Sequence, residues 1–121
     1  MDQNQYDNEH IEQYQLPFKH KDGSLYEFAL VRKNGINFLT DQGATYKQLD
    51  NTFFLDEPDV IMNIVKILKE YKVNKIGNDF LVELVGWDGN TDSEASGVLA
   101  EAKYRLFACV SFTERMGIFY D

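Results

Sequence analysis

The segment Thr40-Asp41-Gln42-Gly43 is where residue types and spacing in this sequence come nearest to a chemical site. An aspartate that ends an apolar strand pattern and precedes a helical pattern is a common position for a metal ligand or a catalytic acid. The same residues also suit a structural role, because a side-chain oxygen of Thr40 or Asp41 can cap the following helix and Gly43 permits a tight backbone. We favour the structural role, since a metal or phosphoryl site needs a second charged cluster that the sequence does not place.

Few other residues are candidates for catalysis or for metal binding. His10 and His20 are the two histidines, and neither has metal-ligand spacing with Cys109, the single cysteine. Cys109 falls on an apolar helical stripe beside Leu106 and Val110, where a cysteine acts as a small buried hydrophobe rather than as a reactive thiolate. Glycine-rich phosphate loops, C-x-x-C pairs and nucleophile elbows do not occur in the sequence. We therefore expect no catalytic residue, no metal site and no cofactor.

Trp87 is a candidate for binding rather than for catalysis. It follows an apolar strand pattern and precedes a loop at 88–92, which resembles a calcium loop in composition but lacks its twelve-residue spacing. An exposed tryptophan at this place would anchor a protein interface, whereas a half-buried one would cover the edge of a sheet. The candidate binding residues are Thr40, Asp41, Gly43 and Trp87.

Hydrophobic periodicity and turn signals predict an α+β domain that positions these residues. Strand patterns run over 16–20, 25–33 and 36–40, and the turns between them are signalled by Asp22-Gly23 and Asn34-Gly35. The later elements are a short helix over 44–49, a helix from 56–59 to 71, a second hairpin over 73–85 and a last helix from about 92 to 113. The expected fold is thus an antiparallel three-stranded meander plus a second hairpin, packed with two main helices and short extra helices. The pattern leaves open whether the strands form one sheet or two.

Helical periodicity also predicts which side chains are buried. In the helix that ends at residue 71, the predicted core face comprises Val60, Ile61, Ile64, Val65, Leu68 and Tyr71. In the last helix it comprises Ala95, Leu99, Ala102, Leu106, Cys109 and Thr113. The apolar run 53–55 is equally expected to be buried.

Length and charge narrow the class of protein. A chain of 121 residues is expected to form a single domain over 15–121, after a polar segment over 1–14 with a weak helical pattern at Tyr6, His10 and Tyr14. The net charge of −8 argues against direct binding to nucleic acid or to an anionic membrane. It is compatible with a basic protein partner and also with plain solubility. The single cysteine, with no signal peptide and no membrane-length apolar run, predicts a cytoplasmic protein.

One group of residues carries a likeness to a known family: Asp22, Gly23, Leu39, Thr40, Asp41, Gly43, Thr45 and Leu49, with the stretch 64–73 and the apolar C-terminal helix. Over residues 15–112 the sequence resembles an uncharacterised family of small bacterial and phage domains, in which a strand ending in Leu-Thr-Asp-x-Gly leads to a short helix. The resemblance implies an accessory protein of a phage or mobile element, and it supplies no catalytic residues. The order of elements is also similar to the secretion-chaperone type of α+β fold, which implies a fold and not a function.

Three functions are open at this point. The first is a non-enzymatic protein-binding module of a phage or prophage, which occludes or inhibits a host, phage or defence protein. The second is a small metal-dependent hydrolytic enzyme that uses Asp41. The third is a homodimeric structural protein whose interface is the C-terminal helix or a sheet edge. We favour the first, because the domain is acidic, aromatic-rich and without a catalytic constellation.

Overall fold

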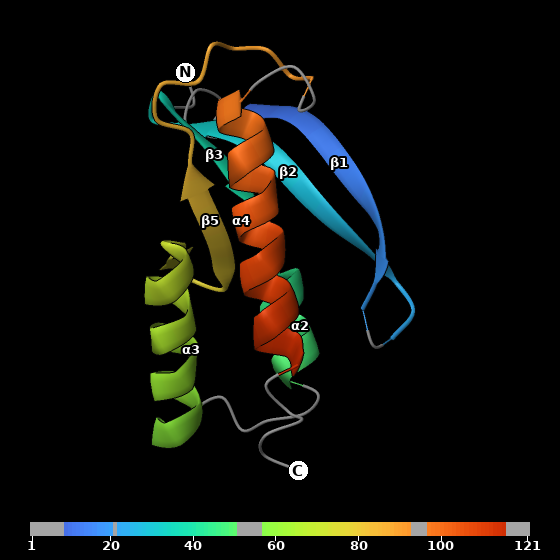
Figure 1. Ribbon diagram of the computed structural model, residues 1–121, viewed down its shortest axis with the longest axis vertical. Helices are drawn as coiled ribbons and strands as arrows, with labels where there is room; N and C mark the ends of the chain where they lie inside the picture. The colour runs from blue at the N-terminus through green and yellow to red at the C-terminus, as the bar shows by residue number, and fades with distance from the viewer. Residues whose placement is uncertain (1–8, 21, 51–56, 93–96, 116–121) are drawn as a thin grey trace, which may run out of the picture.

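Five antiparallel strands form one sheet in the order β1-β2-β3-β5-β4, and helices pack on one of its faces (Figure 1). The structure is a computed structural model in which residues 9–20, 22–50, 57–92 and 97–115 are described. The expected α+β class is confirmed, because helices and an antiparallel sheet occur together. The apolar run 53–55, which the sequence predicts to be buried, lies outside the described residues.

Two groups of hairpin-connected strands join into a single sheet. The strands are β1 (Glu9–Lys19), β2 (Leu25–Lys33), β3 (Ile36–Thr40), β4 (Asn74–Ile76) and β5 (Asp79–Glu83). Asn34 and Gly35, which signalled the turn between β2 and β3, both have positive φ angles, as a type I′ turn requires. Gly77, between β4 and β5, has a φ of 60°. Leu39 of β3 pairs directly with Val82 of β5, so the two hairpin groups share one sheet.

β1 takes the place of the helix predicted near the N-terminus. Residues 9–14, the described part of the polar segment, lie in β1 and pair with β2, so the predicted helix is wrong over these residues. His10 pairs with Val31 and Tyr14 pairs with Phe28. This pairing outweighs the weak helical periodicity of a Gln-rich segment, because strand preference depends mainly on tertiary context. Residues 1–8 lie outside the described residues.

The helices in the described part of the chain are α2 (Ala44–Asp50), α3 (Pro58–Tyr71) and α4 (Gly97–Glu114). α3 begins as expected, with Glu57 at the N-cap position and Pro58 in its first turn. It ends at Lys72, whose left-handed backbone (φ 57°) lets its amide donate to the carbonyl oxygen of Lys69. The predicted start of α4 near residue 92 cannot be compared, since 93–96 lie outside the described residues. None of the described helices is long and apolar enough to cross a membrane.

α4 lies across the covered face of the sheet, with α3 beside it and α2 near its C-terminal end (Figure 1). Its predicted stripe is confirmed over the described residues, since Leu99, Ala102, Leu106, Cys109 and Thr113 are all buried. The apolar members of this stripe share one hydrophobic cluster with inward side chains of the sheet, among them Phe28, Leu30, Leu39, Phe80 and Val82. Each large side chain buried in this way stabilises the fold by about 1.5–3 kcal/mol.

The buried face of α3 differs from the predicted one. Val60, Ile64 and Leu68 are buried as expected, and Ile67 is buried with them. Ile61 and Val65, which were predicted to be buried, are 44% and 43% exposed. Tyr71 is only partly buried. α3 is apolar around more than half of its circumference, and the position of α4 decides which part is covered.

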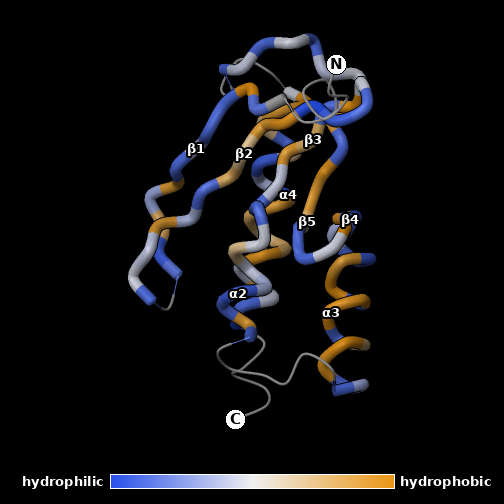
Figure 2. Tube along the Cα trace, turned by 180° about the vertical axis from the view of Figure 1, so that it is seen from behind, coloured by the Kyte–Doolittle hydropathy of each residue, from blue (hydrophilic) through white to orange (hydrophobic). Residues whose placement is uncertain are grey.

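The opposite face of the sheet carries no described helix (Figure 2). Side chains alternate between the two faces along each strand, so this open face receives Val31 and Lys33 of β2, Phe38 of β3 and Leu81 of β5. Val31, Phe38 and Leu81 thus place apolar side chains on the face of the sheet away from α4.

Candidate functional site

The Asp41 carboxylate lies at the junction of β3, α2 and β5, and the residue is 3% exposed. Its Oδ1 accepts hydrogen bonds from the amides of Gly43 at 3.0 Å and Phe80 at 2.9 Å. Its Oδ2 accepts a hydrogen bond from the amide of Thr45 at 3.2 Å. Burial raises the pKa of the Asp41 carboxyl, and the hydrogen bonds oppose this rise. The carboxylate therefore fixes the start of α2 against β5.

Thr40 and Gly43 complete the junction. Thr40 Oγ1 accepts a hydrogen bond from the amide of Gln42 at 3.1 Å. Gly43 has a φ of 80°, and a Cβ at this position would lie 3.3 Å from Oδ1 of Asp79. Both the backbone angle and the space favour glycine here. A metal or hydrolytic role for Asp41 would require its oxygens to leave the amides that they now accept.

Trp87 lies apart from this junction, beyond the end of β5 that is remote from Asp79. Its ring is partly buried against the hydrophobic core, and its Nε1 donates a hydrogen bond to the carbonyl oxygen of Asn90 at 3.0 Å. The indole thus closes the 87–90 loop. The structure brings Thr40, Asp41 and Gly43 together and does not bring Trp87 to them, and a binding role for each of the four stays a prediction.

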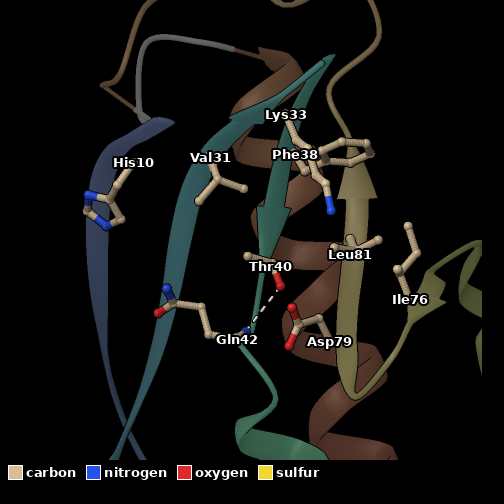
Figure 3. A pocket seen from close by; sticks show the side chains of 9 residues that line it. All are labelled: His10, Val31, Lys33, Phe38, Thr40, Gln42, Ile76, Asp79 and Leu81. Atoms are coloured by element: carbon tan, nitrogen blue, oxygen red, sulfur yellow. Dashed lines mark hydrogen bonds between the residues drawn. The ribbon is translucent and has the colours of Figure 1, made fainter. Parts of the chain in front are cut away.

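A hollow of about 300 Å³ lies on the open face of the sheet, next to the Asp41 junction (Figure 3). Its apolar floor comes from neighbouring strands, through Val31, Phe38 and Leu81. Val31 pairs directly with Phe38, and Leu81 pairs with Thr40, so these side chains share one face. The rest of the lining is His10, Lys33, Thr40, Gln42, Ile76 and Asp79. A hollow of this size with an apolar floor and a polar rim suits a side chain of a partner or a small ligand.

A buried polar group ties the β1–β2 hairpin to the end of α4. His20 Nδ1 lies 2.7 Å from Oε1 of Glu114, and the Tyr26 hydroxyl donates a hydrogen bond to Oε2 of the same carboxylate. All three residues are buried. Burial raises the pKa of the Tyr26 hydroxyl, and the hydrogen bond to Glu114 raises it further, which keeps the tyrosine protonated as the donor. Sequence reasoning missed this group, because His20 and Glu114 are 94 residues apart and no spacing connects them.

His20 also lines a polar hollow of about 400 Å³ between the β1–β2 turn and α2. Polar groups in this lining bond to one another. Asp22 accepts a hydrogen bond from the Ser24 hydroxyl at 2.6 Å and another from Nε2 of Gln48 at 2.9 Å. These bonds lower the pKa of the Asp22 carboxyl. The hollow on the open face, with its apolar floor, is the stronger candidate for binding a partner.

Comparisons with protein-family models, with curated proteins and with solved structures found no match. The likeness to small bacterial and phage domains therefore stays a prediction. The geometry of the open face is what supports a function.

Proposed function

We propose that this protein is a non-enzymatic protein-binding module that contacts its partner through the open face of the sheet. The observation that carries this proposal is the hollow floored by Val31, Phe38 and Leu81 on the face without a described helix. Specific interfaces combine an apolar centre with a polar rim, and Lys33 and Asp79 supply charge at this rim. Phe38 is the expected anchor, since buried aromatic contacts contribute strongly to binding free energy.

The charges at the rim indicate the chemistry of the partner segment. Lys33 lies near Phe38, whereas Asp79 lies at the other end of the hollow, near Gln42 (Figure 3). A segment that places an apolar side chain against Phe38 would gain from an acidic group near Lys33 and a basic group near Asp79. The net charge of −8 would speed encounter with a partner that is basic overall.

The family resemblance suggests the biological setting. In this proposal the protein is an accessory protein of a phage or prophage, and it inhibits a host, phage or defence protein in the cytoplasm by covering part of its surface. Occlusion of this kind needs no catalytic group. It is also in keeping with Asp41, whose carboxylate is occupied by backbone amides. A hydrolytic enzyme that uses Asp41 is less well supported for the same reason.

The test compares capture of bacterial proteins by the wild type, by Phe38→Asp and by a matched control, Tyr104→Asp. Tyr104 is 78% exposed and lies on α4, on the other side of the sheet, so its substitution adds the same charge elsewhere. Quantitative mass spectrometry at low salt is expected to show one protein enriched by the wild type and by Tyr104→Asp. Phe38→Asp is expected to lower this enrichment by about tenfold or more, because a charge would be buried at the centre of the interface.

Circular dichroism must first show that the three proteins fold alike. Equal capture by Phe38→Asp would then rule out the open face as the binding surface. If the wild type enriches no protein relative to a bare matrix, the binding module itself is rejected.

A further inference from the structure

We propose that this protein also pairs with a second copy of itself, through an antiparallel contact between the α3 helices of the two copies. The contact uses the outer face of α3, which we define as Asp59, Ile61, Met62, Val65 and Lys66, all of them exposed. This surface is distinct from the hollow on the open face of the sheet. Self-pairing therefore neither requires nor replaces the partner binding proposed above.

Apolar side chains on the outer face of α3 are the first reason. Ile61, Met62 and Val65 are 44%, 63% and 43% exposed, and Val65 lies three residues after Met62 and four after Ile61, which makes it a neighbour of both on the helix surface. The buried side of the same helix, formed by residues such as Ile64 and Ile67, faces the core. α3 thus presents a second apolar stripe that another helix could cover.

The charges beside this stripe favour a second copy as the occupant. Asp59 lies in the first turn of α3, and Lys66 lies two turns later on the same flank of Met62. Neither side chain has an ion-pair partner among the described residues. In an antiparallel pair, Asp59 of each copy approaches Lys66 of the other, so the same attraction is formed twice around a two-fold axis. In the antiparallel arrangement, the positive end of each helix dipole also lies beside the negative end of the other, which is favourable.

The residue spacing of α3 fits this arrangement. Pro58, Met62, Val65 and Lys69 follow one another at intervals of four, three and four residues, which is the spacing of a helix-pair seam. Placing Met62 of one copy against Val65 of the other aligns Pro58 with Lys69 and brings Asp59 close to Lys66. A helix of 14 residues is about 21 Å long. A stable interface buries about 800 Å² on each partner, and so short a contact buries less. The dimer is therefore expected to be weak.

Sedimentation velocity over about 5–500 µM, the range of weak association, tests self-pairing on the full chain. The wild type is expected to shift from monomer towards dimer as its concentration rises. Met62→Gln is expected to weaken association about fivefold or more, because it removes apolar area at the centre of the contact. Tyr104→Gln, which makes the same residue at an exposed site on α4, is expected to behave as the wild type does.

An exchange of charges tests the antiparallel arrangement itself. Asp59→Lys and Lys66→Glu are each expected to weaken self-association about tenfold at low salt, because two attractions per dimer become repulsions. An equimolar mixture of these two variants is expected to associate again, and so is the double variant. In both cases the charges at positions 59 and 66 once more face opposite charges.

Two results would overturn self-pairing through α3. One is a wild-type protein that stays monomeric over the whole concentration range. This result would overturn self-pairing even if Met62→Gln altered the capture of another protein. The other is a dimer that the Met62 and charge variants leave unchanged, which would place the interface at α4 or at a sheet edge. Phe38→Asp separates this test from the previous one: we expect it to lose the captured partner and keep the dimer. Loss of the dimer in Phe38→Asp would assign self-association to the open face and reject the α3 contact.

Discussion

Asp41 is a single side chain that joins separate parts of the backbone. Its two oxygens accept amide hydrogens from Gly43 in the turn, from Thr45 in α2 and from Phe80 in β5. Buried amides need such partners, and a charged acceptor forms stronger hydrogen bonds than a neutral one. We therefore expect Asp41 to contribute mainly to the stability of the fold.

Asp41→Ala is expected to lower the free energy of unfolding by about 3–5 kcal/mol, because three amides lose their acceptor. Asp41→Asn is expected to cost less, about 1–3 kcal/mol, since Oδ1 can still accept two of the hydrogen bonds while an amide nitrogen would face Thr45. Urea unfolding of the three proteins measures both values. If Asp41→Ala kept wild-type stability and lost only an activity, a chemical role for Asp41 would replace the structural one.

The sequence predicted the local part of this junction and not the distant part. Thr40 and Asp41 indicated a cap because the amides of Gln42, Gly43 and Thr45 lie within four residues of them. Phe80 is 39 residues away from Asp41, and no local spacing shows that β5 will lie beside β3. The hollow escaped prediction for the same reason, since its floor combines side chains of three strands whose neighbours are set by the whole sheet.

Cys109 yields a prediction on pH dependence. Burial raises the pKa of its thiol from 9.0 to about 12. Because the folded value lies above the unfolded one, the associated stability is complete below about pH 9 and is lost as the pH rises towards 12. We expect native protein at about pH 8 to resist a thiol reagent that reacts fully in urea. The urea midpoint should fall between about pH 9 and 12, and fall less in Cys109→Ala. Rapid labelling of the native protein would contradict this burial.

At the scale of elements, the ends of helices were easier to predict than the faces that the helices bury. α3 begins at Pro58 after Glu57 as expected, because an N-terminal proline and acidic residues act locally. Its buried side was predicted only in part, since Ile61 and Val65 are as apolar as the residues that meet α4. β1 was missed over residues 9–14 because a polar edge strand has little apolar alternation of its own.

The His20–Glu114 pair is expected to hold the β1–β2 hairpin to the last turn of α4. Either His20→Ala or Glu114→Ala should lower the free energy of unfolding by about 3–5 kcal/mol. His20→Ala removes one of the two partners of the buried Glu114 carboxylate, and Glu114→Ala leaves both His20 and the Tyr26 hydroxyl without their partner. The double variant should cost much less than the sum of the two. A double-mutant cycle by urea unfolding measures this coupling.

The exposed pair Glu101–Arg105, also on α4, provides the matched control for that cycle. Its Oε1 and Nη1 atoms lie 3.0 Å apart, and Glu101 is 61% exposed. We expect a coupling of about 0–1 kcal/mol there, because water screens exposed charges. Equal couplings in the two cycles would show that the buried pair has no special part in fastening the hairpin.

At the scale of the whole molecule, α4 connects the other elements. It contacts α2, α3, β3 and β5, so loss of its packing should unfold the described domain as one unit. Pattern alone left one sheet or two open, since the pairing of β3 with β5 joins segments that are far apart in sequence. The α+β class was predictable because each hairpin and helix carries its own periodicity.

Leu106→Ala is expected to lower the free energy of unfolding by about 2–5 kcal/mol, because Leu106 is fully buried in the centre of α4 and its removal leaves a cavity. Trp87 fluorescence and far-UV circular dichroism should give the same urea midpoint in this variant, which tests cooperativity. Met62→Ala, at a residue 63% exposed, should change stability by no more than about 0.5 kcal/mol. Two separate midpoints would show that α4 does not couple the sheet to the helices.

The two edges of the sheet affect whether the protein aggregates at high concentration. β1 has 11 residues, but its register with β2 is interrupted between His10 and Glu12 and between Gln15 and Lys19, and Pro17 has no amide hydrogen to donate. β4, at the other edge, has only three residues and carries the exposed Lys75. Such edges give an extended chain no continuous row of hydrogen bonds, and they therefore hinder the strand-by-strand growth of amyloid fibres. The molecule can thus carry an apolar hollow on one face of its sheet while the edges of the sheet resist aggregation.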